Sequence, residues 1–150
     1  MNFSYFEGDV YMKILYWSGT GNTEKMANLI AKGIVEKGKE AEIVAVSDAN
    51  SDIFNTEDIV ILGCPAMGDE VLEEGEFEPF VEELESKVSG KKVALFGSYG
   101  WGDGQWMRDF EERMVSYGCV SSLDPLIVSN EPEGDTEEQC IEFGRKIAEL

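Results

Sequence analysis

The sequence contains no histidine and is short of positive charge. Of its 150 residues, 12 are Lys or Arg and 31 are Asp or Glu, and the formal net charge is −19. Without His, the chain lacks the commonest general base and metal ligand, so triad hydrolysis and His-bearing zinc sites are excluded. The shortage of Lys and Arg argues against binding to nucleic-acid phosphates and against adsorption to anionic membranes.

Cysteines and long apolar runs are also scarce. The three cysteines, Cys64, Cys119 and Cys140, are odd in number and show no C-x-x-C spacing, so we predict neither a disulfide framework nor a thiolate metal site. Reduced, buried thiols in a cytoplasmic protein are the expectation. No apolar run approaches the roughly 20 residues that span a bilayer. Residues 1–11 lack the features of a secretion signal.

What is present indicates one α/β domain, whose first apolar run begins at Met12. Five near-continuous apolar runs predict strands covered by helices on both faces, at Met12–Trp17, Glu42–Val46, Asp58–Gly63, Lys92–Gly97 and about Leu123–Val128. Amphipathic stretches between them predict helices over Thr23 to about Lys37, after Pro79, around Trp106–Tyr117 and over Thr136–Leu150. Ser47–Glu57 is expected to hold one helical turn around Ile53. The alternation predicts a three-layer sandwich with a five-stranded parallel sheet.

Ligands of such sheets bind beyond the carboxyl ends of the strands, and an unusual loop follows the first strand there. It reads SGTGNT, at Ser18–Thr23. Its two glycines, hydroxyls and amide let several N–H groups and a helix N-terminus converge on one point, as a phosphate site requires. It contains no Walker A lysine, and Glu24 stands where a dinucleotide fingerprint needs its third glycine. An ordinary capped turn is the alternative.

Two further loops follow the third and fourth predicted strands. Cys64–Glu70 (CPAMGDE) places a polarisable Met beside a Gly whose peptide can reverse at low steric cost. Gly97–Gly104 (GSYGWGDG) holds an indole among four glycines, which suits one wall of a slot for a flat aromatic ligand better than a core position. Together the three loops predict a phosphorylated planar heterocycle as the ligand.

These loops resemble those of the flavodoxins. SGTGNT, MGDE and SYGWGDG, each after its strand, are similar to motifs of the short-chain flavodoxins of anaerobic clostridia. The likeness extends through nearly all of Met12–Leu150, including WMRDFEER at Trp106–Arg113 and IEFG at Ile141–Gly144. The fifth strand carries no long insertion, as in the short-chain group. The resemblance implies a flavodoxin-like sheet of order 2-1-3-4-5 and a noncovalently bound FMN.

The resemblance also implies a place for each part of the cofactor. The phosphate is expected on Ser18–Thr23, with Met67 on the inner face of the ring, Trp101 on its outer face and Glu70 accepting from the ring N3–H. Asp69 and Asp103 are expected to be charge sources and loop braces. The expected cofactor-binding residues, with no catalytic or metal-ligating residue among them, are Ser18, Gly19, Thr20, Gly21, Asn22, Thr23, Ala66, Met67, Gly68, Asp69, Glu70, Ser98, Tyr99, Gly100, Trp101, Gly102, Asp103 and Asn130.

A protein of this kind is implied to be an electron carrier and not an enzyme. We expect a low-potential one-electron carrier that moves mainly between the FMN semiquinone and hydroquinone. Acidic surroundings make the anionic hydroquinone costly, and the Gly68 peptide can turn its carbonyl toward ring N5 and favour the semiquinone.

An acidic segment, Asp69–Glu78, lies beside the expected flavin edge. Its carboxylates belong to Asp69, Glu70, Glu73, Glu74, Glu76 and Glu78. The segment is either a solvated loop face or a surface that steers a monomeric carrier toward basic patches on reductases and low-potential oxidoreductases.

Two other functions stay open at the level of sequence. A small FMN-dependent quinone or nitro-group reductase would need substrate space on the flavin, which Trp101 is expected to occupy. A flavin-free signalling domain of the same fold would need an acidic cluster with a phosphorylatable Asp, but Ser-Gly-Thr-Gly follows the first strand. A visible spectrum and a test for steady NADPH oxidation separate these functions. Pro65, which stiffens the approach to the Met67–Gly68 loop, departs from the family pattern. That pattern would begin at Met12, so the resemblance implies a domain over residues 12–150 preceded by a non-essential extension, residues 1–11.

Overall fold

The computed structural model describes residues 11–150, so residues 1–10 of the predicted extension lie outside the described part. Tyr11, which we assigned to that extension, is the first residue of β1 and pairs with Glu40. The strands are β1 (Tyr11–Tyr16), β2 (Glu40–Ala45), β3 (Ile59–Gly63), β4 (Lys92–Tyr99), β5 (Val120–Ser121) and β6 (Leu126–Ser129). They form one parallel sheet of order β2-β1-β3-β4-β5, with β6 also beside β4. The predicted strand order is confirmed.

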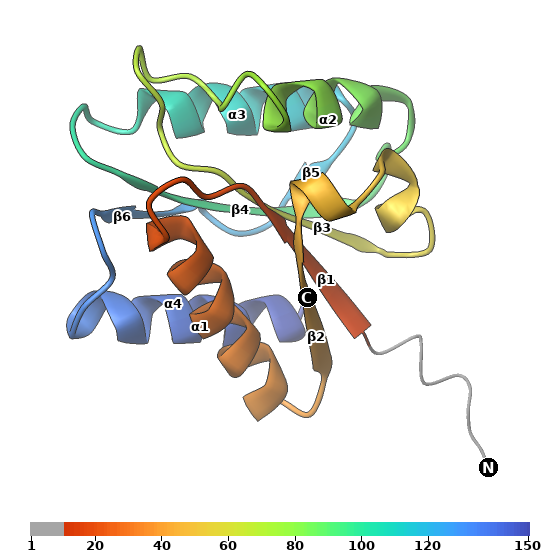
Figure 1. The fold of residues 1–150 in the computed structure, drawn as a ribbon. Helices are drawn as coiled ribbons and strands as arrows, with labels where there is room; N and C mark the ends of the chain where they lie inside the picture. The colour runs from red at the N-terminus through yellow and green to blue at the C-terminus, as the bar shows by residue number, and fades with distance from the viewer. Residues whose placement is uncertain (1–10) are drawn as a thin grey trace.

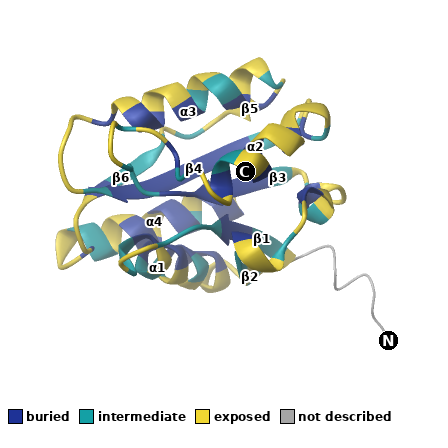
Figure 2. Cartoon of the chain, turned by 45° about the horizontal axis from the view of Figure 1, so that its top comes forward, coloured by how far each residue is buried: buried dark blue, intermediate teal, exposed yellow. Residues whose placement is uncertain are grey.

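Helices cover both faces of this sheet, as Figure 1 shows. The helices α1 (Asn22–Glu36) and α4 (Asp135–Ala148) pack on one face against residues such as Ile14 and Ile61. The helices α2 (Phe77–Glu83) and α3 (Gln105–Ser116) pack on the other against residues such as Leu15 and Leu62. Alternate residues of each strand thus enter opposite cores. In Figure 2 the central strands β3 and β4 are mostly dark blue, and the outer faces of the helices on either side are exposed. The three-layer sandwich is confirmed.

The structure corrects two of the predicted boundaries. The fifth strand is divided: β5 pairs with the start of β4 and β6 with its end, and the irregular stretch between them includes Pro125, which cannot donate to a ladder. The second helix begins at Phe77 and not after Pro79, because a proline in the first helical turn removes no intrahelical hydrogen bond. The predicted turn around Ile53 is confirmed as the 3₁₀ helix η3 (Ser51–Phe54). Two further 3₁₀ turns are η2 (Val46–Asp48) and η4 (Leu84–Ser86).

Two glycines set the contact between α1 and α4. A methyl group added at Gly33 would overlap the Ile141 carbonyl oxygen, and one added at Gly144 would overlap the Ile30 carbonyl oxygen. The backbones of the two helices therefore touch, which explains why both positions hold the smallest residue. This contact sets the spacing between α1 and α4, and the first two residues of α1, Asn22 and Thr23, are the last two of the Ser18–Thr23 segment.

The three cysteines are buried and free, as predicted. Burial raises the pKa of the Cys64 and Cys140 thiols to about 12 and that of Cys119 to about 11. No helix within residues 11–150 has the length and apolar character needed to cross a membrane.

Candidate functional site

The predicted loops meet at a cavity beyond the carboxyl ends of the strands. The cavity measures about 260 Å³ and is open to solvent. Its lining comes from four separate segments and consists of Trp17, Gly19, Thr20, Asn22, Pro65, Ala66, Met67, Ser98, Tyr99, Gly100 and Asn130. Nine of these eleven residues are among the predicted site residues. The lining is polar where α1 begins and apolar around Met67 and Tyr99, so the cavity fits an amphipathic, partly buried ligand.

The Ser18–Thr23 loop caps the start of α1. Gly21 takes a left-handed conformation, with φ +98°, and Ser18 Oγ accepts from the backbone N–H groups of Gly21 at 3.1 Å and Glu24 at 3.3 Å. Thr20 and Asn22 line the cavity. The first N–H groups of a helix have no intrahelical acceptor, so this end of the cavity presents donors to an anion.

Thr23 lies with this loop but its hydroxyl points elsewhere. Thr23 Oγ1 and Ser98 Oγ lie 3.0 Å apart, and the Ser98 backbone N–H donates to Thr23 Oγ1 at 3.3 Å. Both residues are buried. The pair ties the start of α1 to the end of β4, so Thr23 acts inside the fold rather than on the cavity surface.

The loop after β3 is a tight hairpin. The Met67 backbone N–H donates to Val71 O at 2.9 Å, and the Val71 N–H donates back to Met67 O at 3.2 Å. Gly68 has φ +25°, and Glu70 has φ +58°, a left-handed conformation unusual for a residue with a side chain. Glu70 Oε1 accepts from the backbone N–H of Gln105, the first residue of α3, at 3.0 Å. Glu70 therefore joins this hairpin to the loop after β4.

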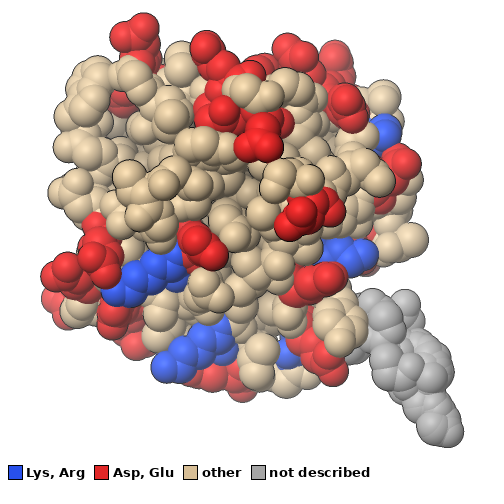
Figure 3. Space-filling view, in the orientation of Figure 1, with Lys and Arg blue, Asp and Glu red and all other residues tan. Residues whose placement is uncertain are grey.

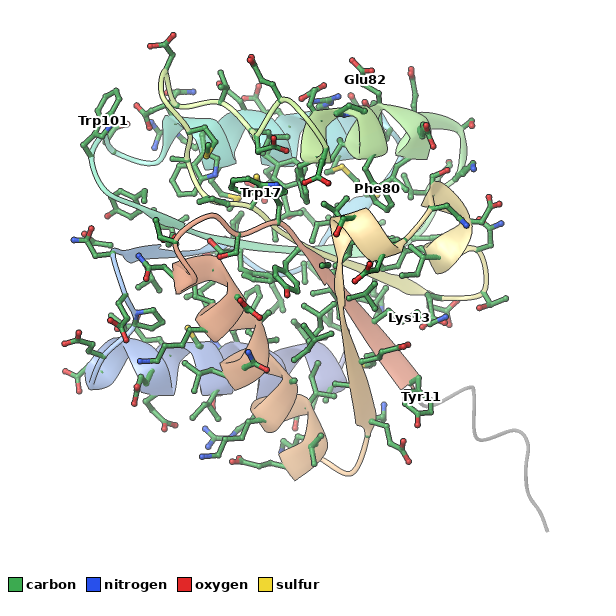
Figure 4. All side chains as sticks on the ribbon, in the orientation of Figure 1. Tyr11, Lys13, Trp17, Phe80, Glu82 and Trp101 are labelled. Carbon is green, nitrogen blue, oxygen red and sulfur yellow. The ribbon has the colours of Figure 1, made fainter. Side chains whose placement is uncertain are left out.

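The loop after β4 is held at both ends, while Trp101 projects outward. The Asn130 backbone N–H donates to Tyr99 O at 2.8 Å, and Asp103 pairs with Arg108 at 3.0 Å. The Trp101 side chain is 64% exposed and is outside the cavity lining. Figure 4 shows it projecting from the edge of the molecule. Asn130, with φ +62°, lines the cavity.

The acidic segment Asp69–Glu78 is more than a solvated face. Glu73 accepts from the backbone N–H groups of Gly75, Glu76 and Phe77, each at 2.8 Å, and so caps α2. Burial raises the pKa of Glu73, but those three donors outweigh burial and hold it below its ordinary value. Glu78 pairs with Arg113 of α3. Glu78 alone of the six carboxylates in this segment has a cationic partner among the described residues, so the segment keeps most of its charge.

The predicted site residues do not include Trp17 and Pro65, yet both line the cavity. Trp17 ends the first predicted strand, and Pro65 is expected only to stiffen the approach to Met67 and Gly68. The Trp17 indole N–H donates to Glu76 Oε1 at 3.0 Å, across 59 residues of chain. Strand periodicity carries no signal for such a distant contact.

Nine of the predicted site residues do not line the cavity: Ser18, Gly21, Thr23, Gly68, Asp69, Glu70, Trp101, Gly102 and Asp103. A larger groove of about 450 Å³ lies between α4 and Asp124–Leu126, away from the three loops. Within the described residues, no cluster of Cys, Asp and Glu could hold a metal ion.

Comparisons with known proteins point to one family. The flavodoxin family model matches residues 14–144. The chain is 70% identical to the flavodoxin of Clostridium beijerinckii over 139 residues, which cover 93% of this chain and all of that protein. The solution structure of two-electron reduced Megasphaera elsdenii flavodoxin is similar with a TM-score of 0.83 and 43% identity, covering 92% of this chain and 98% of that one. The chain is also 34% identical to the nitric oxide reductase of Moorella thermoacetica over 133 residues, which cover 85% of this chain and 33% of that protein.

Proposed function

The chain belongs to the flavodoxin family, and on that premise we propose how it holds its cofactor and meets its partners. Like other flavodoxins it binds FMN, carries electrons and passes them to redox partner enzymes; it is an electron-transfer protein and not an enzyme. Its relatives therefore support the carrier over the reductase and the signalling domain. FMN, when bound, supplies the redox chemistry, and the protein supplies binding and electrostatic control.

We propose that the Ser18–Thr23 loop holds the phosphate. Support comes from the N–H donors at the start of α1 and from the cavity lining by Gly19, Thr20 and Asn22. Lys25, the cation nearest in sequence, is engaged elsewhere, because its Nζ lies 2.9 Å from Glu131 and 3.1 Å from Glu137. The loop thus binds the phosphate through N–H and hydroxyl donors and not through an ammonium group.

Met67 and Trp101 would be the walls on either side of the flat ring. Met67 lines the cavity, and Trp101 projects beside it with most of its surface free for stacking. Glu70 already accepts the Gln105 N–H with Oε1, which leaves Oε2 to accept a ring N–H. Backbone of Ala66, Ser98, Tyr99, Gly100 and Gly102, together with Asn130, would line the rest of the cofactor. The convergence of three loops on one cavity is the observation that carries this assignment.

The acidic segment would keep the potential low and guide partners. Its carboxylates oppose a second negative charge on the cofactor, and they attract basic patches on reductases and low-potential oxidoreductases. In Figure 3 carboxylates spread over the upper edge of the molecule, whereas most Lys and Arg on this face lie in its lower half.

We further propose that the carrier works as a cytoplasmic monomer. Three free, buried cysteines suit a reducing compartment. The exposed large apolar side chains of the described residues come from different elements, and a net charge of −19 opposes self-association. Residues 1–10, which precede β1, are proposed to be dispensable for FMN binding.

Titration of the apoprotein with FMN, followed by flavin fluorescence and the visible spectrum, tests the site. The full chain and a chain that begins at Tyr11 should bind FMN equally. Trp101→Ala should weaken binding by about ten-fold, since an aromatic stacking contact contributes roughly 0.5–1.5 kcal/mol beyond its buried area. Trp101→Phe should recover most of that loss. Val115→Ala, which also removes an exposed apolar side chain, is the control. An apoprotein that takes up no FMN would refute the site. An unchanged FMN affinity in Trp101→Ala would refute the proposed stacking of Trp101 on the ring.

A further inference from the structure

Trp17 connects the phosphate loop to the acidic segment. It follows β1 and directly precedes Ser18, and its N–H donates to Glu76 Oε1 at 3.0 Å. Its ring also lies under Gly19, because a methyl group added at Gly19 would stand 3.0 and 3.2 Å from ring carbons Cη2 and Cζ3. Figure 4 places Trp17 near the end of β1, where β1 gives way to the loop before α1.

Glu76 gives this indole a fixed support. The Glu76 backbone N–H is bound by the Glu73 carboxylate, and Glu76 is the N-cap residue of α2, which packs on the core through Phe77 and Phe80. The main chain of Glu76 is therefore fixed, and its carboxylate accepts the indole N–H from an anchored backbone position. The Trp17 ring is therefore held by Glu76 while Gly19 rests on it.

We propose that Trp17 is a positioning residue for the phosphate end of the site: Glu76 fixes the indole, and the indole fixes Gly19 and the donors that follow it. This inference rests on the proposed placement of the phosphate on Ser18–Thr23. Phosphate recognition depends on charge-assisted N–H bonds, whose strength falls steeply when donors move. In the proposed placement the flat ring would be held by the loops after β3 and β4, so the effect of Trp17 would be confined to the phosphate.

The test compares the affinities of each apoprotein for FMN and for riboflavin, which lacks the phosphate. Trp17→Phe keeps a flat ring under Gly19 but removes the N–H donor. This variant should lower the affinity for FMN by about ten-fold and the affinity for riboflavin by less than about two-fold. The ten-fold loss is the effect expected when a charge-assisted hydrogen bond is misplaced. Glu76→Met, which removes the acceptor on an exposed residue, should lower the FMN preference to a similar degree.

Two controls separate the effect of losing the hydrogen bond from the effect of losing a negative charge. Glu76→Gln keeps an oxygen acceptor and should preserve the preference for FMN. Glu74→Gln removes one negative charge from the same segment without touching Trp17, and so measures the effect of charge alone. The double variant Trp17→Phe/Glu76→Met should be no weaker than either single variant, because both remove one interaction. Melting temperatures of the apoproteins verify that each variant folds.

Each outcome decides one point. An FMN-to-riboflavin ratio that stays at the wild-type value in Trp17→Phe and Glu76→Met overturns the role of Trp17, as does an equal loss for both ligands. A wild-type protein that binds FMN no better than riboflavin overturns the proposed phosphate site itself. A ratio that falls in both variants and survives in Glu76→Gln supports the inference.

Discussion

At the scale of single residues, Gly68 and Glu70 show how a short hairpin accommodates unusual backbone. Both have positive φ, and the hydrogen bonds between Met67 and Val71 close the hairpin around them. A side chain added at Gly68 would meet no atom within 4 Å. Substitution there therefore acts through backbone preference and not through a clash.

Gly68→Ala should narrow the gap between the two one-electron midpoint potentials of the FMN-loaded protein, and Gly68→Val should narrow it further. The physical reason is that a Cβ restricts the peptide reversal by which the Gly68 carbonyl would meet a proton on ring N5. A spectroelectrochemical titration measures both potentials. Gly90→Ala is the matched control, since Gly90 also has positive φ and open space but lies in the turn before β4. Potentials that move equally in both variants would contradict the role of Gly68.

At the scale of elements, the acidic segment ends in α2 and is tied to α3 through Glu78. Glu78 of α2 pairs with Arg113 of α3, whose guanidinium also donates to Tyr117 Oη at 2.9 Å. The hydrogen bonds from Arg113 hold the pKa of Glu78 below its ordinary value, against the opposing effect of burial. The pair is partly buried, so it stabilises the α2–α3 contact more than an exposed ion pair would.

Glu78→Gln should lower the free energy of unfolding by about 1–2 kcal/mol at pH 7. Because the folded-state pKa of Glu78 is lowered, its contribution is complete above the ordinary value of 4.5 and is lost as pH falls through the folded-state value. The wild type and the variant should therefore converge in stability below pH 4.5. Urea unfolding at a series of pH values tests this. Glu83→Gln, on an exposed residue of the same helix, should show no such convergence.

At the scale of the whole molecule, the fold determines how the negative charge of the acidic segment is presented. Glu70, Glu73 and Glu76 are bound by neutral N–H donors, which fix the carboxylates without cancelling their charge. Asp69 and Glu74 are exposed. The acidic segment thus presents oriented negative charge beside the cavity, and such charge raises association rates with cationic partners.

Asp69→Asn should slow electron transfer from the reduced protein to a basic cytochrome by roughly two-fold at low salt, and the difference should vanish as ionic strength rises. Stopped-flow kinetics at several salt concentrations measure the effect. Asp58→Asn removes the same charge from an exposed residue directly before β3, at the end of the sheet opposite the cavity. This variant should leave the rate unchanged. A rate that ignores salt, or that falls equally in both variants, would count against steering.

The predictions from sequence succeeded where the signal was local. Apolar runs and helical periodicity identified the sheet, its layers and four helices, and glycine-rich loops at strand ends marked the cavity. The boundary errors at Pro79 and Pro125 have one cause. A proline is compatible both with the first turn of a helix and with a break in a strand, so its presence in the sequence does not show where a helix begins or where a strand is interrupted.

The amino-acid sequence alone determined the fold class, the loops and the excess of negative charge, because each follows from composition and from spacing between near neighbours. Only the tertiary structure decided that Trp17 reaches Glu76, that Thr23 turns to Ser98 and that Glu70 caps α3. Those contacts join residues far apart in the chain, and their partners become neighbours only when the sheet brings the ends of β1, β3 and β4 together.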